Sequence, residues 1–496
     1  VNDMTLAIQG GGRFNSWDNN SITLNEDGGK LRLADNATAL SYLTYAEIVT
    51  NAVLDIEKNK TSICPGDNVG TDNDGNLSQI LVDNVDHKGN TTFELGQNTN
   101  LSFLNSIEVP SLRTMTIEGS EGQLNFGGTV TFKNSSKFIL NSSGSVLKGI
   151  FDYTGNNLLK VEQPINITSS TSTWGENSEI NISNTASLVF TDNQWVTKER
   201  LEKSGGTMTF ENLIWSLNED TNFSSDSSVT AKTLNLNNHS LTLSSENSDL
   251  TVTDNLTLND ASEQILTGSA DVILSDTVIL EEGKISSTAG LISFEKGLLQ
   301  SGGTLDVKDS TFRLGDNFEK TSGVLTTSLD GTTLEITENL SYSSDSSIEV
   351  KQINLNDKTL TMATETSDIV VNEEITLNEI GEKIITGSAD LSLNGVLNVS
   401  GGTLESSDGT LTFVGEINQT GGSLNLENSI IKLNSDLIKT AGSLQISGST
   451  ITPMSTLNIT SNTAITAKTI ELNGKTVSLG SENTDLVLTE NFSIES

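Results

Sequence analysis

The amino-acid sequence predicts an all-β fold, a right-handed parallel β-helix (β-solenoid) with coils of about 20 residues. Three observations predict it: a long segment recurs after 119 residues, glycines recur at a shorter constant interval inside that segment, and apolar residues alternate with polar ones between the glycines. Self-similarity at a fixed spacing is the signature of a repeat architecture. Alternation with a period of two places the apolar side chains of a strand on one face. We therefore expect strands that stack coil upon coil around an apolar bore.

The long repeat is clearest at its start. The segment from Ser224 to Val229 returns 119 residues later as Ser343 to Ile348, and a third copy, now 117 residues further on, is recognisable from Ala467. The predicted β-solenoid spans residues 111–496, and its repeats are 224–342, 343–459 and an incomplete 460–496.

Glycines mark the corners of the expected coils. Gly283, Gly303 and Gly323 are evenly spaced, one expected coil apart, and the next long repeat has glycines at the same spacing. Between such corners, runs such as Leu256–Leu258 and Leu411–Phe413 alternate apolar residues with threonine. Gly, Asn, Asp and Ser, which favour turns, fill the intervals between the runs.

Residues 1–110 lack this rhythm, and we expect them to form a less regular, partly helical N-terminal cap domain. Asp35 or Asn36 can cap a helix that runs to Lys58, because apolar residues recur there every three or four positions. These residues are Leu40, Leu43, Ala46, Val49, Val53 and Ile56. Such a helix would cover the open end of the bore, where unpaired strand edges invite stacking. A membrane-surface helix is the alternative, but the stretch has no basic stripe.

The composition favours a thin solenoid over a compact globule. Only 34% of the 496 residues are hydrophobic, which suits coils that each need a narrow apolar seam. The net charge of −38 makes nucleic acid and anionic membranes poor partners, since both require a basic face. A single cysteine, Cys64, excludes a disulfide-stapled scaffold. The chain starts without an export signal and its last repeat is incomplete, so we expect both ends to be processed or trimmed.

One Gly-rich acidic loop is a candidate metal site. It contains Asp67, Asp72 and Asp74 together with asparagine side chains, and such hard oxygen donors are what Ca²⁺ takes. The spacing does not fit an EF-hand loop, because Gly70 stands where the first carboxylate belongs. The alternative interpretation is a solvated acidic turn. Ca²⁺ is the only cofactor that the sequence suggests.

Two tryptophans, Trp174 and Trp195, are candidate carbohydrate contacts. An exposed indole stacks its face on a sugar ring. The alternative is that both residues belong to the core, as the apolar neighbours of Trp215 indicate for that residue.

Catalytic constellations are missing from the sequence, so we expect no enzyme activity. Only two histidines occur, His87 and His239, and both lie in turn-like segments. A Ser/His/Asp set would have to recruit one of them. Gly-Gly pairs coincide with coil corners and not with a nucleotide-binding strand–loop–helix pattern.

The tandem Ser-Gly-Gly-Thr corners, at Ser301–Thr304 and Ser400–Thr403, together with the alternating strands, resemble the large repetitive adhesins of bacterial surfaces. These include filamentous haemagglutinin-like proteins and autotransporter passenger domains. The resemblance covers residues 111–496 and is architectural, so it transfers a class of protein and no functional residue. It implies an extracellular stalk or scaffold at a bacterial cell surface, which takes part in adhesion or in the assembly of surface layers or filaments.

Three function hypotheses follow. The first is this structural or adhesive β-solenoid, with a surface glycan or a neighbouring cell-surface protein as partner, or with self-association. The second is a polysaccharide-binding or polysaccharide-degrading β-helix of the tailspike or lyase kind. The third is a flat binding face made of outward threonines, namely Thr242, Thr251, Thr257, Thr361, Thr376 and Thr412. Threonine at exposed strand positions is also ordinary β-propensity.

Overall fold

The computed structural model describes residues 5–8, 22–24, 30–33, 46–56, 61–65, 78–87, 91–95, 99–103, 106–120 and 122–494. Every regular element in this part of the chain is a β-strand, and stacked strands pair in parallel. The predicted all-β parallel β-solenoid is therefore confirmed. Among the described residues no helix has the length and apolar character needed to cross a membrane.

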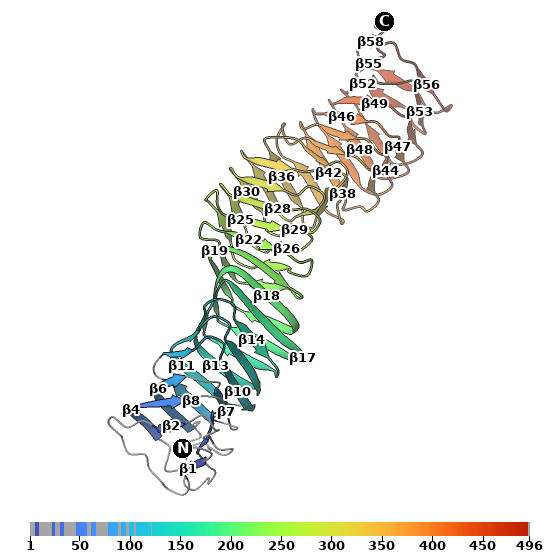
Figure 1. The fold of residues 1–496 in the computed structure, drawn as a ribbon. Helices are drawn as coiled ribbons and strands as arrows, with labels where there is room; N and C mark the ends of the chain where they lie inside the picture. The colour runs from blue at the N-terminus through green and yellow to red at the C-terminus, as the bar shows by residue number, and fades with distance from the viewer. Residues whose placement is uncertain are drawn as a thin grey trace. The chain divides into compact units, whose positions relative to one another are not determined.

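The chain divides into two compact units, residues 1–251 (unit 1) and 252–496 (unit 2). Within each unit, Figure 1 shows strands lying one above the next along successive coils. Each coil forms its backbone hydrogen bonds with the coil before it and the coil after it. Because parallel neighbours come from consecutive turns of the chain, the sequence spacing between paired residues is the length of one coil.

Parallel stacking begins ahead of residue 111. The first strands are β1 (Thr5–Ile8), β2 (Ile22–Leu24), β3 (Lys30–Leu33), β4 (Ala46–Ile56), β5 (Thr61–Pro65), β6 (Ser78–His87), β7 (Thr91–Leu95), β8 (Thr99–Phe103) and β9 (Ile107–Val109). Strands β7, β8 and β9 pair with the next coil, β10 and β11.

The helix expected from Asp35 to Lys58 is wrong where the structure describes this segment. Residues 46–56 form β4, which pairs in parallel with β6 from Ala46↔Ile80 onward. The run is rich in β-branched residues, which lose rotamer freedom in a helix and favour strands. The remainder of the predicted helix lies outside the described residues.

The strands of unit 1 from residue 114 onward range from three to eighteen residues, and the longest of them contain register shifts. They are β10 (Thr114–Ser120), β11 (Gln123–Phe132), β12 (Lys137–Ser143), β13 (Ser145–Tyr153), β14 (Leu158–Val161), β15 (Ile165–Thr168), β16 (Thr171–Trp174), β17 (Asn177–Thr191), β18 (Gln194–Glu211), β19 (Ile214–Ser225), β20 (Val229–Ala231), β21 (Thr233–Asn235), β22 (Ser240–Leu243) and β23 (Leu250–Val252). β17 pairs with β18 from Asn177↔Arg200, and the register shifts within the pair. Such a bulge changes the local coil length and bends the strand.

Unit 2 is more regular. Its strands are β24 (Leu256–Leu258), β25 (Gln264–Thr267), β26 (Val272–Leu274), β27 (Val278–Leu280), β28 (Lys284–Ser287), β29 (Leu291–Phe294), β30 (Leu298–Gln300), β31 (Thr304–Asp306), β32 (Thr311–Leu314), β33 (Asn317–Lys320), β34 (Val324–Thr326), β35 (Thr333–Ile336), β36 (Leu340–Ser344), β37 (Ile348–Val350), β38 (Gln352–Asn354), β39 (Thr359–Met362), β40 (Ile369–Val371), β41 (Ile375–Leu377) and β42 (Lys383–Gly387). They continue as β43 (Leu391–Leu393), β44 (Leu397–Val399), β45 (Thr403–Ser406), β46 (Thr410–Phe413), β47 (Ile417–Gln419), β48 (Ser423–Leu426), β49 (Ile430–Leu433), β50 (Leu437–Lys439), β51 (Ser443–Gln445), β52 (Thr450–Pro453), β53 (Leu457–Ser461), β54 (Ile465–Ala467), β55 (Thr469–Glu471), β56 (Val477–Leu479), β57 (Leu486–Leu488) and β58 (Phe492–Ser493).

Three strands make one coil in unit 2, and through most of the unit each strand stacks on its equivalent in the coil before. Val278 pairs with Leu298, and Lys284 pairs with Thr304, which is the interval that separates the corner glycines. The alternation seen in the sequence is the alternation of burial: Leu256 and Leu258 point into the bore while Thr257 is exposed.

The glycine corners allow the coils to approach closely. A Cβ on Gly302 would lie 1.9 Å from the carbonyl oxygen of Glu281 in the coil before. The next residue, Gly303, has a φ of +59°, in the left-handed region that favours glycine. The Ser-Gly-Gly-Thr corner is therefore required by backbone packing.

Three coils interrupt the regular succession, and we call them the junction coils (residues 224–243, 343–362 and 460–479). At the second, the sheet that contains β33, β36 and β39 continues, whereas β34 and β38 are the last strands of their sheets. New sheets begin with β37 and β41. At the third, the sheet of β50, β53 and β56 likewise continues, β51 is a last strand and β54 a first one. Two of the three ladders are thus broken at the second junction and one at the third, and other contacts must hold these coils together.

Candidate functional site

The predicted calcium ligands Asp67, Asp72 and Asp74 lie outside the described residues. Within the part of the chain that the structure describes, no group of three or more His, Cys, Asp or Glu side chains is placed to hold a metal ion. The calcium site remains a prediction.

Trp174 and Trp195 are fully buried, at 0% exposure. The Trp174 ring stacks on Tyr153 with centroids 4.5 Å apart and meets Trp195 edge-on at 5.5 Å. This corrects the expectation of a carbohydrate contact, because an indole without exposed surface cannot stack on a sugar. The core interpretation is the one that agrees with the structure. The reason is positional: both residues fall on the inward phase of their strands, β16 and β18.

The two tryptophans belong to a continuous column of rings in the bore of unit 1. Its members, linked by successive ring contacts, are Phe103, Phe126, Phe132, Phe138, Phe151, Tyr153, Trp174, Phe190, Trp195, Phe210, Trp215 and Phe223. Burial raises the pKa of the Tyr153 phenol, which therefore stays protonated. Large rings fill a wide bore efficiently, and the column is packing and not a ligand platform.

The outward threonines do not form a flat row. Thr376 is followed on the next coil by Asn398, and Thr412 lies between Ser392 and Lys432. A flat binding face made of threonines would require threonine at the same position of every coil. The sequence places these threonines on the outer face correctly, but the structure gives no regular lattice of hydroxyl groups.

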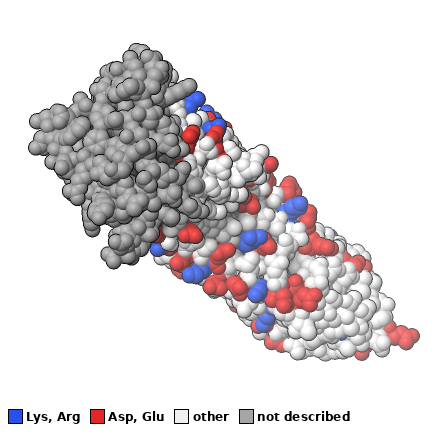
Figure 2. Space-filling view, turned by 90° about the horizontal axis from the view of Figure 1, so that it is seen from below, with Lys and Arg blue, Asp and Glu red and all other residues white. Residues whose placement is uncertain are grey.

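Charged residues on the outer faces pair between consecutive coils. Arg313 Nε lies 2.9 Å from Glu335 Oε2, and Lys383 Nζ lies 2.7 Å from Glu405 Oε2. Figure 2 shows basic side chains interspersed among more numerous acidic ones on the face drawn. Half-buried surface pairs of this kind contribute about 1 kcal/mol each. They reduce repulsion between stacked acidic residues without creating a basic patch on that face.

Buried lysines next to the junction coils were not anticipated from the sequence. Lys203 and Lys320 are 2% and 3% exposed, and each ammonium group reaches into the loop of the following coil. Lys203 Nζ donates to Asp226 Oδ1 at 2.5 Å, to Ser227 Oγ at 2.9 Å and to the carbonyl oxygen of Gly206 at 2.9 Å. The lysine therefore ties the loop of the first junction coil to the coil before it.

Lys320 repeats this arrangement 117 residues later. It pairs with Asp345 in the loop between β36 and β37, where the backbone ladder is interrupted. A sequence signal for these lysines exists: Lys320 lies two residues after the core residue Phe318, so strict alternation points it into the bore. A lysine on the apolar phase of a strand indicates a buried cation with a partner.

A serine network accompanies each lysine. The amide of Ser344 donates to Ser367 Oγ at 2.9 Å, and Ser344 Oγ donates to the carbonyl oxygen of Ser346 at 2.7 Å. The corresponding bonds recur around Ser225 at 2.8 and 2.7 Å and around Ser461 at 2.8 and 2.7 Å. These bonds satisfy backbone groups that the broken ladders leave open.

The third lysine differs in its partner. Lys439 is 2% exposed, but its Nζ donates to Asn462 Oδ1 at 2.5 Å and to Thr463 Oγ1 at 3.3 Å. An amide oxygen replaces the carboxylate of the earlier copies. Burial lowers the pKa of Lys439 below the ordinary lysine value.

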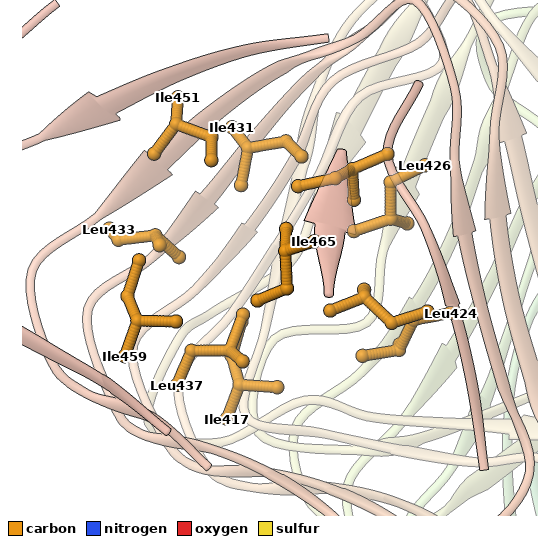
Figure 3. Close-up of a pocket in the computed structure, with 11 residues that line it drawn as sticks. Ile417, Leu424, Leu426, Ile431, Leu433, Leu437, Ile451, Ile459 and Ile465 are labelled. Carbon is orange, nitrogen blue, oxygen red and sulfur yellow. The ribbon is translucent and has the colours of Figure 1, made fainter. Parts of the chain in front are cut away.

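Leu437, on the same strand as this lysine, lines a small cavity of about 10 Å³ in the bore. Figure 3 shows isoleucine and leucine side chains converging on it from several strands of consecutive coils. The lining residues are Ile417, Leu424, Leu426, Ile431, Leu433, Leu437, Leu444, Ile446, Ile451, Ile459 and Ile465. A space of this size holds at most about one water molecule, and an aliphatic lining offers it no hydrogen bond. It is a packing defect and not a substrate pocket.

The described residues thus supply an internal polar tie at each junction and a bore packed with apolar side chains around one small cavity in unit 2. Comparison of the chain with protein-family models, with characterised proteins and with solved structures finds no match.

Proposed function

We propose that this chain is a non-catalytic, extracellular β-solenoid that acts as a stalk or scaffold in adhesion or assembly at a bacterial cell surface. The observation that supports the proposal most directly is the junction tie: Lys203 and Lys320 each bind the loop of the next coil at a point where the ladder is broken. A structure that holds itself together across every interruption suits a spacer that must remain continuous.

Two further observations favour the same role. Outer side chains pair mainly with those of the neighbouring coil, as Arg313 does with Glu335. The cavity lined by Leu437 and Ile459 is too small for a ligand. A glycan or a neighbouring surface protein remains the proposed partner of the assembled structure, and Ca²⁺ remains the proposed ion of the N-terminal region.

The test compares the chain with a flexible linker of equal length. Each is displayed on a bacterial surface beneath a terminal epitope, on cells that carry a capsule. For a stalk, we expect antibody-coated beads to reach the epitope on the chain and not on the Gly/Ser linker, because a flexible coil of n residues extends only as the square root of n. Equal access on both would contradict the stalk.

The polysaccharide-degrading alternative is decided by a second measurement. The purified chain is incubated with capsular and biofilm polysaccharides, and new reducing or unsaturated ends are counted. We expect none. Release of such ends would contradict the proposed stalk function and favour an enzyme of the tailspike or lyase kind.

A further inference from the structure

The bore positions that precede the three junction coils can be compared directly, because strand pairing aligns them. In the first copy they are Trp195, Leu201, Trp215 and Phe223; in the second Phe312, Phe318, Leu334 and Tyr342; in the third Ile431, Leu437, Ile451 and Ile459. All twelve are buried. The first two copies each place three aromatic rings here, and the third places none.

The missing rings coincide with the cavity. In the second copy, Phe318 stacks on Tyr342 with centroids 5.0 Å apart and meets Phe312 at 5.9 Å. Their counterparts Leu437, Ile459 and Ile431 all line the cavity. A void forfeits dispersion contacts on one side of each lining residue, so these coils are less well packed than their equivalents.

The missing carboxylate falls in the same two strands. Leu437 and Lys439 lie on β50, which pairs with β53 through Leu437↔Ile459 and Lys439↔Ser461. Asn462 follows β53 directly, so the uncompensated cation and the void share one strand pair. A buried cation without a counter-charge destabilises the folded state.

We propose that the β50–β53 ladder is a built-in opening point, at which unit 2 separates first under heat or tension. Coils of a solenoid couple mainly to their nearest neighbours, so a defect confined to one strand pair lowers the stability of that pair before that of the others. The proposal follows from packing and charge alone and does not rest on the proposed role as a stalk.

Hydrogen exchange on the full chain tests it, with the second copy as internal control. We expect the amides of residues 457–461 in β53 to exchange at least tenfold faster than those of residues 340–344 in β36. The repaired variant Leu437→Phe/Asn462→Asp should slow exchange in β53 at least tenfold. The mirror variant Phe318→Leu/Asp345→Asn should speed exchange in β36 by a similar factor.

Two results would overturn the proposal. Equal exchange in β53 and β36 of the unaltered chain would mean that the defect has no effect on local opening. The second result is fast exchange in β53 that the repaired variant leaves unchanged, together with a mirror variant that does not alter exchange in β36. It would mean that β53 opens because the C-terminal coils fray, and not because of the cavity and the missing carboxylate. The mirror variant guards against a repaired variant that fails to pack its new ring.

Discussion

Lys439 Nζ lies 2.5 Å from Asn462 Oδ1, where the two earlier copies of the same junction place the carboxylates of Asp226 and Asp345. The lysine is buried in all three copies, but in the third copy its partner carries no charge. Three copies of one arrangement in a single chain therefore provide a natural series in which the value of a buried ion pair can be read.

The first prediction removes the lysines one at a time. Lys439→Met keeps the length of the side chain and removes a buried charge that no carboxylate compensates, so we expect unchanged stability or a gain of about 1 kcal/mol. Lys320→Met removes a charged hydrogen bond to Asp345, and we expect a loss of about 1–2 kcal/mol, since that carboxylate is partly solvated and its desolvation is small. Urea unfolding measures both. A larger loss for Lys439→Met than for Lys320→Met would contradict the assignment.

The second prediction concerns pH. The pKa of Lys439 is lowered in the folded state, so above that pKa the unfolded chain binds more protons than the folded one. Stability attributable to this group should therefore rise with pH from the folded pKa up to the ordinary lysine value of 10.5. Other groups titrate in this range as well. The measurement is accordingly the difference in unfolding free energy between the unaltered chain and Asn462→Asp, whose carboxylate restores the ordinary behaviour of the lysine. A difference that does not vary with pH would refute the prediction.

The architecture was predictable because two periodic patterns of the sequence, the alternation of apolar residues and the spacing of glycines, correspond directly to features of the fold. Alternation at Leu256–Leu258 predicts which side chains enter the bore, and the spacing of Gly283 and Gly303 predicts the coil length; strand pairing at that same interval, as between Val278 and Leu298, confirms both. Near the N-terminus periodicity misleads, since a spacing of three or four residues predicts a helix in 46–56, whereas five of these eleven residues are β-branched and the segment is a strand.

Functional residues were harder to anticipate, for two physical reasons. An indole can pack in a hydrophobic core or stack on a sugar ring, so composition alone could not decide between these two roles for Trp174 and Trp195. The strand phase decides it. The junction tie joins Lys320 to Asp345 across one coil, and such a pair has no local motif. Only comparison of the three copies at equivalent positions reveals it.

The third prediction concerns the glycine corners. Gly302→Ala would bring a Cβ within 1.9 Å of the Glu281 carbonyl oxygen, so the coils must move apart, and we expect a loss of about 1–3 kcal/mol. The matched control is Gly268→Ala, where a Cβ meets nothing within 4 Å and stability should be unchanged or slightly higher. Thermal unfolding distinguishes the two. Similar losses at both positions would mean that the corner glycines are not selected by close approach.

The fourth prediction concerns calcium. Carboxylates gathered by Asp67, Asp72 and Asp74 would repel one another, and a divalent ion would turn that repulsion into ligation and stabilise the state that gathers them. We expect a chelator to increase proteolysis within residues 64–90 and to leave the coils beyond residue 224 intact. Identical cleavage with and without chelator would contradict the calcium site and favour the alternative interpretation of the loop as a solvated acidic turn. Global unfolding would mean that calcium stabilises the coils themselves.

The last prediction tests whether damage stays local. Leu258 is fully buried in β24 and pairs with Leu280, while its neighbour Thr257 is exposed. Leu258→Asp places a charge without a partner in the apolar bore and should cost several kcal/mol, about 3–5 by analogy with broken buried pairs. Thr257→Asp adds the same charge to solvent and should change stability by less than about 0.5 kcal/mol. Because coils couple to nearest neighbours, hydrogen exchange should show lost protection within a few coils of β24 and native protection in β46–β49. Loss of protection throughout unit 2 would show that its coils unfold as one cooperative block. In that case the opening point proposed at β50 and β53 would have to act on the whole unit rather than on one strand pair.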